Sequence, residues 1–142
     1  MTKAGTTHTF NLRVYYEDTD AEGIVYYANY LKFAERARSE FLREIGWPPA
    51  KMWEELRDYW VVTECNVKYR KPAALDDWLT VKTSIKKLQS VSLMLQQDIY
   101  RDEELLTTLS IRLAYLHENS QIARIPKAIS ALMVPYLFAE SS

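Results

Sequence analysis

The feature that most restricts the fold of this chain is one long segment with helical periodicity, from about Ala28 to Ile45. Apolar residues recur there at steps of three and four, and charged residues fill most positions between them. This spacing predicts a helix of about 27 Å with one broad apolar face. Gly46 follows as a candidate C-cap, and Pro48 and Pro49 prevent the helix from continuing. Such a helix needs a partner surface that covers its apolar face.

The remaining apolar segments alternate with period two. One lies before the helix at residues 9–16, where Phe10, Leu12, Val14 and Tyr16 share a face, and four follow at 60–71, 78–88, 91–101 and 104–116. The alternation predicts strands, and short connections between the last three predict antiparallel hairpins. Residues 52–57 predict a short helical turn, and residues 125–138 a short strand or helix. We expect an α+β fold in which one antiparallel sheet wraps around a long central helix.

Length and composition favour a single domain over residues 1–142, with 1–8 and 139–142 as frayed tails. Eighteen Lys and Arg against nineteen Asp and Glu give a net charge of -1, which argues against nucleic-acid binding. The single cysteine, Cys65, precludes an internal disulfide and favours a cytoplasmic location; its side chain is interpreted as buried. The chain shows neither a signal peptide nor an apolar run long enough to predict a membrane span.

Common catalytic motifs are absent from the sequence. It contains no G-x-S-x-G, no glycine-rich phosphate loop and no H-E-x-x-H, and its two histidines, His8 and His117, lie near opposite ends. We therefore expect no metal and no cofactor. A different arrangement stands before the helix, where Asp18, Asp20 and Gly23 occupy a polar loop.

This loop places a carboxylate beside the unpaired N–H groups of a helix N-terminus. Those N–H groups carry partial positive charge and can hold an oxyanion. A carboxylate and an oxyanion hole suffice to hydrolyse an activated acyl group such as a thioester, because a thiolate leaves without protonation. Spacing alone favours the structural alternative, in which an Asp in such a loop forms a cap or an Asx turn.

The stretch Arg13–Gly46 contains Asp-x-Asp-x-x-Gly-x-Val-Tyr, followed on the helix by Glu35-Arg36-Ala37-Arg38. Together with Val62–Thr83, it resembles the 4-hydroxybenzoyl-CoA thioesterase family of hotdog-fold acyl-CoA hydrolases. It is most similar to the branch of tol-pal system-associated acyl-CoA thioesterases. The resemblance implies a hotdog fold and hydrolysis of an acyl-CoA thioester to a free acid and CoA.

The resemblance also implies roles for single residues. Asp20 is then the catalytic carboxylate, as nucleophile or as general base for water, and the main-chain N–H of Tyr27 is the oxyanion donor. Gly23 allows the loop to turn, and Asp18 braces it. The tol-pal branch commonly carries His at the position of Tyr27, so no imidazole exchanges protons here, although the 4-hydroxybenzoyl-CoA enzyme itself has Tyr at this position.

For substrate binding, Glu35 matches an acid that reaches the far end of the substrate in the aromatic-specific relative; its alternative is a helix ion pair with Arg36 or Arg38. Tyr26 and Tyr30 belong to an aromatic set that lines an acyl pocket or, alternatively, forms core.

Expected partners are acyl-CoA, acyl carrier protein and a second copy, as a homodimer or homotetramer with active sites at the dimer interface. The rival function is a non-catalytic module that binds acyl thioesters or acyl carrier protein. A hotdog dehydratase is disfavoured, because it needs a His beside the carboxylate.

Overall fold

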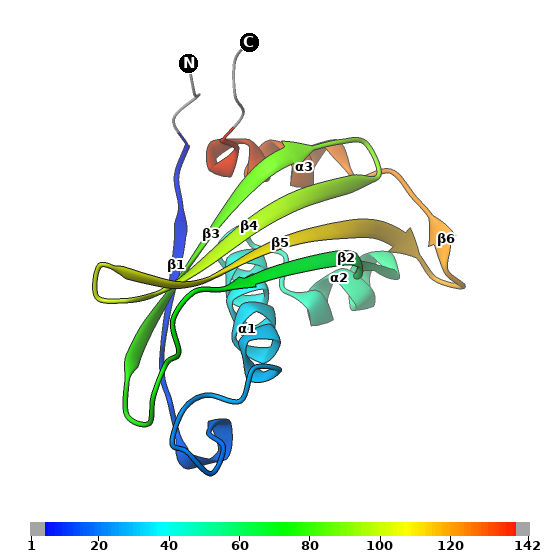
Figure 1. The fold of residues 1–142 in the computed structure, drawn as a ribbon. Helices are drawn as coiled ribbons and strands as arrows, with labels where there is room; N and C mark the ends of the chain where they lie inside the picture. The colour runs from blue at the N-terminus through cyan, green and yellow to red at the C-terminus, as the bar shows by residue number, and fades with distance from the viewer. Residues whose placement is uncertain (1–4, 139–142) are drawn as a thin grey trace.

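A computed structural model describes residues 5–138, in which an antiparallel sheet covers a layer of helices (Figure 1). The strands are β1 (His8–Arg13), β2 (Asp58–Tyr69), β3 (Trp78–Leu88), β4 (Ser92–Arg101), β5 (Glu104–His117) and β6 (Gln121–Ile122). The α-helices are α1 (Asn29–Glu44), α2 (Pro49–Leu56) and α3 (Lys127–Met133). Two 3-10 turns, η1 (Tyr16–Asp18) and η2 (Val134–Tyr136), complete the elements.

The sheet has the strand order β1-β3-β4-β5-β2, with β6 paired to β5, and every pairing of these strands is antiparallel. The predicted hairpins β3–β4 and β4–β5 are confirmed. After β1 the chain runs through α1 and α2 before it enters β2 at the opposite edge of the sheet. In the described part of the chain, β1 and β2 are therefore the edge strands, and β2 has 12 residues.

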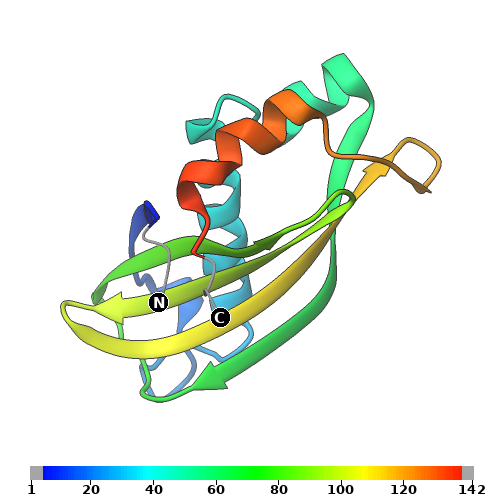
Figure 2. The ribbon, with the colours of Figure 1, turned by 90° about the horizontal axis from the view of Figure 1, so that it is seen from above.

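The core lies between the concave face of the sheet and α1. Figure 2 shows α1, α2 and α3 on the same side of the sheet. The apolar side of α1 carries Phe33, Ala37 and Phe41, each at most 1% exposed. The buried strand residues are alternate positions, as a half-covered sheet requires: Leu79, Val81, Ile85, Leu95, Ile99, Leu109 and Ile111. This packing fixes α1, and with it the position of the helix N-terminus.

The end of α1 follows the prediction for Gly46. This residue has φ +93°, its N–H donates to the carbonyl of Arg43 at 3.0 Å, and the N–H of Trp47 donates to Leu42 at 2.9 Å. These are the two hydrogen bonds of a Schellman motif, so the glycine C-cap is confirmed.

Three sequence-based expectations differ from the structure. A single long central helix is not confirmed, because α1 with 16 residues shares its side of the sheet with α2 and α3. Tyr16 is 81% exposed rather than buried, because β1 ends at Arg13 and the chain turns into η1. Cys65 is exposed, because β2 is an edge strand whose residues 62–66 are uncovered in the protomer.

His8, which the sequence assigns to a frayed tail, is the first residue of β1 and pairs with Thr83. Residues 1–4 and 139–142 of the expected tails lie outside the described residues. Among residues 5–138, no helix combines the length and apolar character that crossing a membrane requires.

Candidate active site

Asp18 braces the loop between β1 and α1. It is 7% exposed, and its Oδ2 accepts the N–H of Tyr15 at 2.9 Å. Its main-chain oxygen accepts the N–H of Tyr26 at 3.0 Å and the side-chain amide of Asn29 at 2.8 Å. These bonds join the start of the loop to its end, so the bracing role predicted for Asp18 is confirmed.

Asp20 lies on the same loop with an exposed side chain. Its Oδ1 accepts the N–H of Glu22 at 2.8 Å, in an Asx turn, and its main-chain oxygen accepts the N–H of Gly23 at 3.0 Å. Gly23 has φ +80°, and a Cβ added there would meet no atom within 4 Å. The positive φ, and not a lack of space, is therefore what favours glycine at this position. The Oδ2 of Asp20 accepts no hydrogen bond from residues 5–138, which leaves one carboxylate oxygen available to a ligand.

The main-chain N–H of Tyr27 has no acceptor among the residues that the structure describes. The segment is held on both sides of it, since the N–H of Val25 donates to Ala73 and the N–H of Asn29 donates to Tyr26, each at 2.8 Å. No side chain caps α1. This N–H lies just before the first residue of α1, Asn29, and is a donor available to an oxygen atom of a ligand.

Four tyrosines meet at this end of α1. The hydroxyl of Tyr69 donates to the carbonyl of Tyr27 at 3.2 Å, and the ring centroids of Tyr26 and Tyr27 lie 4.9 Å apart. Tyr30 differs, because it is 3% exposed, its hydroxyl accepts the N–H of Ala73 at 3.0 Å, and burial raises its pKa. The hydroxyl of Tyr30 is therefore buried and occupied by a hydrogen bond within the protein, whereas the rings of Tyr26 and Tyr27 are exposed.

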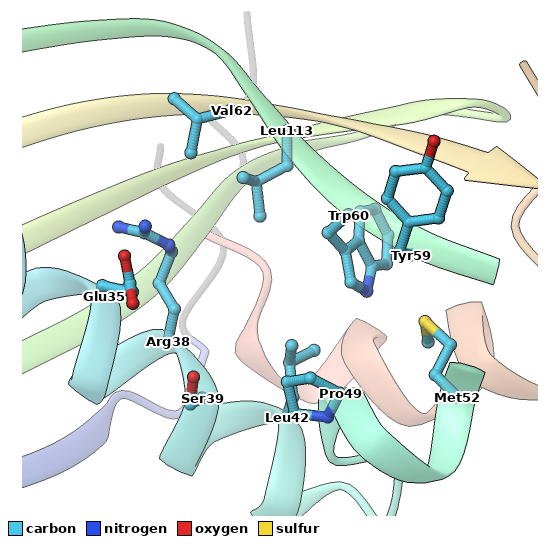
Figure 3. Close-up of a pocket in the computed structure, with 10 residues that line it drawn as sticks. All are labelled: Glu35, Arg38, Ser39, Leu42, Pro49, Met52, Tyr59, Trp60, Val62 and Leu113. Carbon is cyan, nitrogen blue, oxygen red and sulfur yellow. The ribbon is translucent and has the colours of Figure 1, made fainter. Parts of the chain in front are cut away.

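Three of the predicted residues line two cavities of about 250 Å³ each. One is lined by Ile24, Val25, Tyr27, Tyr30, Tyr69, Arg70, Lys71 and Pro72. The other lies between α1, α2 and the sheet (Figure 3) and is lined by Glu35, Arg38, Ser39, Leu42, Pro49, Met52, Tyr59, Trp60, Val62 and Leu113. The structure thus brings Tyr27 and Tyr30 to one cavity and Glu35 to the other, while Asp20 and Tyr26 line neither. We call the second one the α1–α2 cavity.

Arg38 enters the α1–α2 cavity one turn after Glu35. Its Nη1 donates to the Oε1 of Gln97 at 3.1 Å, and burial lowers the pKa of its guanidinium, against a smaller opposite effect of Glu35. The alternative helix ion pair of Glu35 with Arg36 or Arg38 does not form within residues 5–138. Glu35 remains an exposed carboxylate at the rim of this cavity.

Sequence reasoning identifies neither Trp60 nor Gln97, and it names Arg38 only as an alternative ion-pair partner of Glu35. For Gln97 a signal was present, because this polar residue takes the position between Leu95 and Ile99 on the buried face of its strand. A polar residue on such a face needs internal hydrogen bonds, which points to a network beneath it.

Comparisons with known proteins agree with this fold. Residues 22–108 match the family model described as the thioesterase superfamily. The acyl-CoA thioesterase YbgC of Haemophilus influenzae is 38% identical over 106 residues, which cover 75% of this chain and 78% of that protein. A probable thioesterase from Bartonella henselae is 37% identical, with a TM-score of 0.82 over 85% of this chain and 100% of that one. A 4-hydroxybenzoyl-CoA thioesterase variant complexed with 4-hydroxybenzoyl-CoA, 21% identical, shares the fold at a TM-score of 0.83, over 89% and 98% of the two chains.

Proposed function

The chain belongs to the thioesterase superfamily and is an acyl-CoA thioesterase, and we propose that Asp20 and the main-chain N–H of Tyr27 form its catalytic pair. The observation that carries this proposal is the unpaired Tyr27 N–H, held at the uncapped start of α1 on the loop that carries Asp20. The remaining carboxylate oxygen of Asp20 supports it, because the other is occupied by the N–H of Glu22.

In the proposed reaction, the thioester carbonyl oxygen accepts the N–H of Tyr27, which stabilises the negative charge that develops on it. As a nucleophile, Asp20 attacks the carbonyl carbon, the carbon–sulfur bond breaks, and water then hydrolyses the mixed anhydride. As a general base, Asp20 takes a proton from a water molecule that attacks the same carbon directly. In both routes the CoA thiolate leaves with the bonding electron pair and needs no acid. Gly23 acts through the loop turn that its positive φ allows.

We place the complete active site between two copies of the chain. Asp20 is exposed and lines neither cavity of the protomer, so a second copy would supply the missing wall. The edge strand β2 has a free edge that could pair with the same strand of a second copy, and its residues Val62 and Tyr69 are 44% and 49% exposed. The resulting assembly is a homodimer or a homotetramer. Sedimentation should then give a species of two or four times the 16.7 kDa protomer mass.

For the acyl group we propose the α1–α2 cavity, whose lining is largely apolar, with Glu35 as a substrate-binding residue at its rim. Tyr26 and Tyr30 flank the thioester end, Tyr26 as an exposed ring and Tyr30 from the wall of the cavity beside Tyr27. Acyl carrier protein presents the same pantetheine thioester as CoA and is a second proposed partner. The lone Cys65 supports a reducing, cytoplasmic location.

The test is a thiol-release assay with short, long and aromatic acyl-CoAs. Asp20→Asn should lower kcat by about 10²- to 10⁴-fold, the usual contribution of a positioned acid or base. Asp102→Asn is the matched control, because Asp102 lies in the β4–β5 turn at φ +54°, a conformation that Asn tolerates, and should retain wild-type turnover. Full activity of Asp20→Asn would contradict the catalytic assignment. Tight acyl-CoA binding without turnover by the unsubstituted chain would favour the binding module instead.

A further inference from the structure

The face of the sheet opposite the three helices (Figure 2) carries a polar groove of about 300 Å³ beside the edge strand β2. The strand register places six of its residues in two rows across β2, β5 and β4, which are Lys68-Thr108-Asp98 and Asn66-Ser110-Gln96. Side chains alternate between the two faces of a sheet, and the intervening Leu109 is buried in the core. The rows therefore point away from α1. We call this cavity, together with Arg70 at its end, the β2 groove.

Lys68 and Arg70 give the β2 groove a positive charge. Both side chains are exposed, and neither forms an ion pair within residues 5–138. The carboxylate in the groove, Asp98, pairs with neither cation, because its Oδ2 accepts the side-chain amide of Gln96 at 3.0 Å and its Oδ1 is buried. Two accessible cations against one carboxylate suit an anionic ligand, although the chain as a whole has a net charge of -1.

The β2 groove adjoins the cavity that contains Tyr27. Among the described residues, Arg70 is the one that the linings of these two cavities share. Tyr69, the last residue of β2, precedes Arg70, and its hydroxyl donates to the main-chain carbonyl of Tyr27 at 3.2 Å. A ligand that leaves Tyr27 along this cavity therefore meets Arg70 first and Lys68 beyond it.

We propose that the β2 groove binds the phosphate groups of the CoA substrate, with Arg70 and Lys68 as the residues that contact them. This inference rests on the proposed function, in which the thioester carbonyl meets the N–H of Tyr27 and the acyl group enters the α1–α2 cavity. The CoA part of the substrate then extends the other way, toward Arg70. A guanidinium and an ammonium group are the usual protein donors to phosphate oxygens.

The dimensions agree with this placement. CoA carries its phosphates beyond the pantetheine arm, which has two amide units and the length of about five residues of extended chain, about 16 Å. Between Asn66 and Arg70 the β2 groove follows the chain for about 13 Å, at about 3.3 Å per residue. The arm is therefore long enough to pass from Tyr27 to Arg70 and to place the phosphates beside Lys68.

The test compares hexanoyl-CoA with S-hexanoyl-pantetheine, which has the same thioester and no phosphate. Lys68→Gln and Arg70→Gln each keep a polar side chain and remove the charge. Each should raise the KM for hexanoyl-CoA about two- to fivefold, the range of an exposed ion pair, and the double variant should raise it about tenfold. The KM for S-hexanoyl-pantetheine and the kcat values for both substrates should change by less than about twofold, because contacts at the thioester are kept.

Arg112→Gln is the matched control. Arg112 is an exposed cation on the same face of β5, opposite Glu64 of β2, and it lines neither the β2 groove nor the other two cavities. Its substitution should change the KM for hexanoyl-CoA by less than about twofold, which separates a bound phosphate from general attraction of an anionic substrate. A rise in KM equal to that of Arg70→Gln would overturn the proposal.

Failure of this inference is distinguishable from failure of the proposed function. If the double variant raises the KM for both substrates equally, or for neither, the β2 groove does not bind the phosphates, while loss of thiol release in Asp20→Asn would still support the catalytic assignment. Calorimetric binding of free CoA and of pantetheine to Asp20→Asn needs no turnover. Adding Lys68→Gln and Arg70→Gln should raise the Kd of CoA about tenfold and leave the Kd of pantetheine unchanged. An unchanged Kd of CoA would contradict the inference.

Discussion

The side-chain amide of Gln97 donates a 3.0 Å hydrogen bond to the main-chain carbonyl of Ala34, which ties the centre of β4 to α1. The same nitrogen donates to the hydroxyl of Thr83 at 3.0 Å, and the Oε1 of Gln97 accepts Arg38. Gln97 and Thr83 are both 0% exposed, so these polar groups depend on one another for hydrogen bonds. The network couples the sheet to α1, the helix that begins two residues after the proposed oxyanion donor Tyr27.

Replacing Gln97 by Met, which is similar in size, should lower the free energy of unfolding by about 1–3 kcal/mol. The loss arises because Thr83 and Arg38 each lose a buried partner. Urea unfolding measures it, and Gln96→Met is the control on the opposite face of β4, where a change within about 0.5 kcal/mol is expected. Equal stability of Gln97→Met and the unsubstituted protein would show that the network contributes nothing.

Substitutions of Asp18 and of Asp20 should have different effects, the first on the stability of the protein and the second on its activity. Asp18→Ala removes the acceptor of the Tyr15 N–H and should lower the free energy of unfolding by about 1–2 kcal/mol, as loss of a cap does. Asp20→Asn keeps an oxygen for the Glu22 N–H, so its stability should change by less than about 0.5 kcal/mol while thiol release falls. Thermal unfolding and the thiol assay on both variants check this. A comparable loss of stability in the two would contradict the division of roles.

Local patterns predict the elements of this fold and its hairpins well, but they do not show which strands lie at the edges of the sheet. The expected helix 28–45 and the observed α1, Asn29–Glu44, differ by one residue at each end, and β3 spans 78–88 as expected. Periodicity and capping are local, which explains the agreement. The exposure of Cys65 follows from the place of β2 at the sheet edge, which is set by pairing with β5 and not by the composition of the strand.

In the candidate site, too, local contacts are predictable from the sequence and long-range contacts are not. The motif singles out Asp18, Asp20 and Gly23, and the side chains of the two aspartates accept main-chain N–H groups within three residues along the chain. The pairing of the Tyr30 hydroxyl with Ala73 joins residues 43 positions apart, and the Trp60–Tyr115 contact joins two strands. Contacts of this range depend on tertiary packing, so no local pattern distinguishes a pocket tyrosine from a core one.

Gly23→Ala tests the left-handed turn in the catalytic loop. At φ +80° an alanine is strained, and the free energy of unfolding should fall by about 1–2 kcal/mol. Gly46→Ala is the matched control, because Gly46 has φ +93° at the end of α1 and also has open space around its Cα. Urea unfolding should show similar losses for both variants, whereas only Gly23→Ala should reduce kcat in the thiol assay. Equal kcat values for the two would argue against a role of this turn in placing Asp20.

His8 should make the protein sensitive to acid. Its Nδ1 is buried without a partner in the described chain, its ring meets Phe41 edge-on at 5.9 Å, and burial lowers its pKa from 6.5 despite the opposing effects of Glu44 and Glu40. Because the folded state binds this proton less readily than the unfolded state, the contribution of His8 is complete above about pH 6.5 and is lost as the pH falls through the lower folded-state pKa. His8→Phe removes this proton uptake. Urea unfolding at about pH 7.5 and about pH 5.5 should therefore show a smaller loss of stability on acidification for the variant. An equal loss in both proteins would mean that groups other than His8 account for the acid sensitivity.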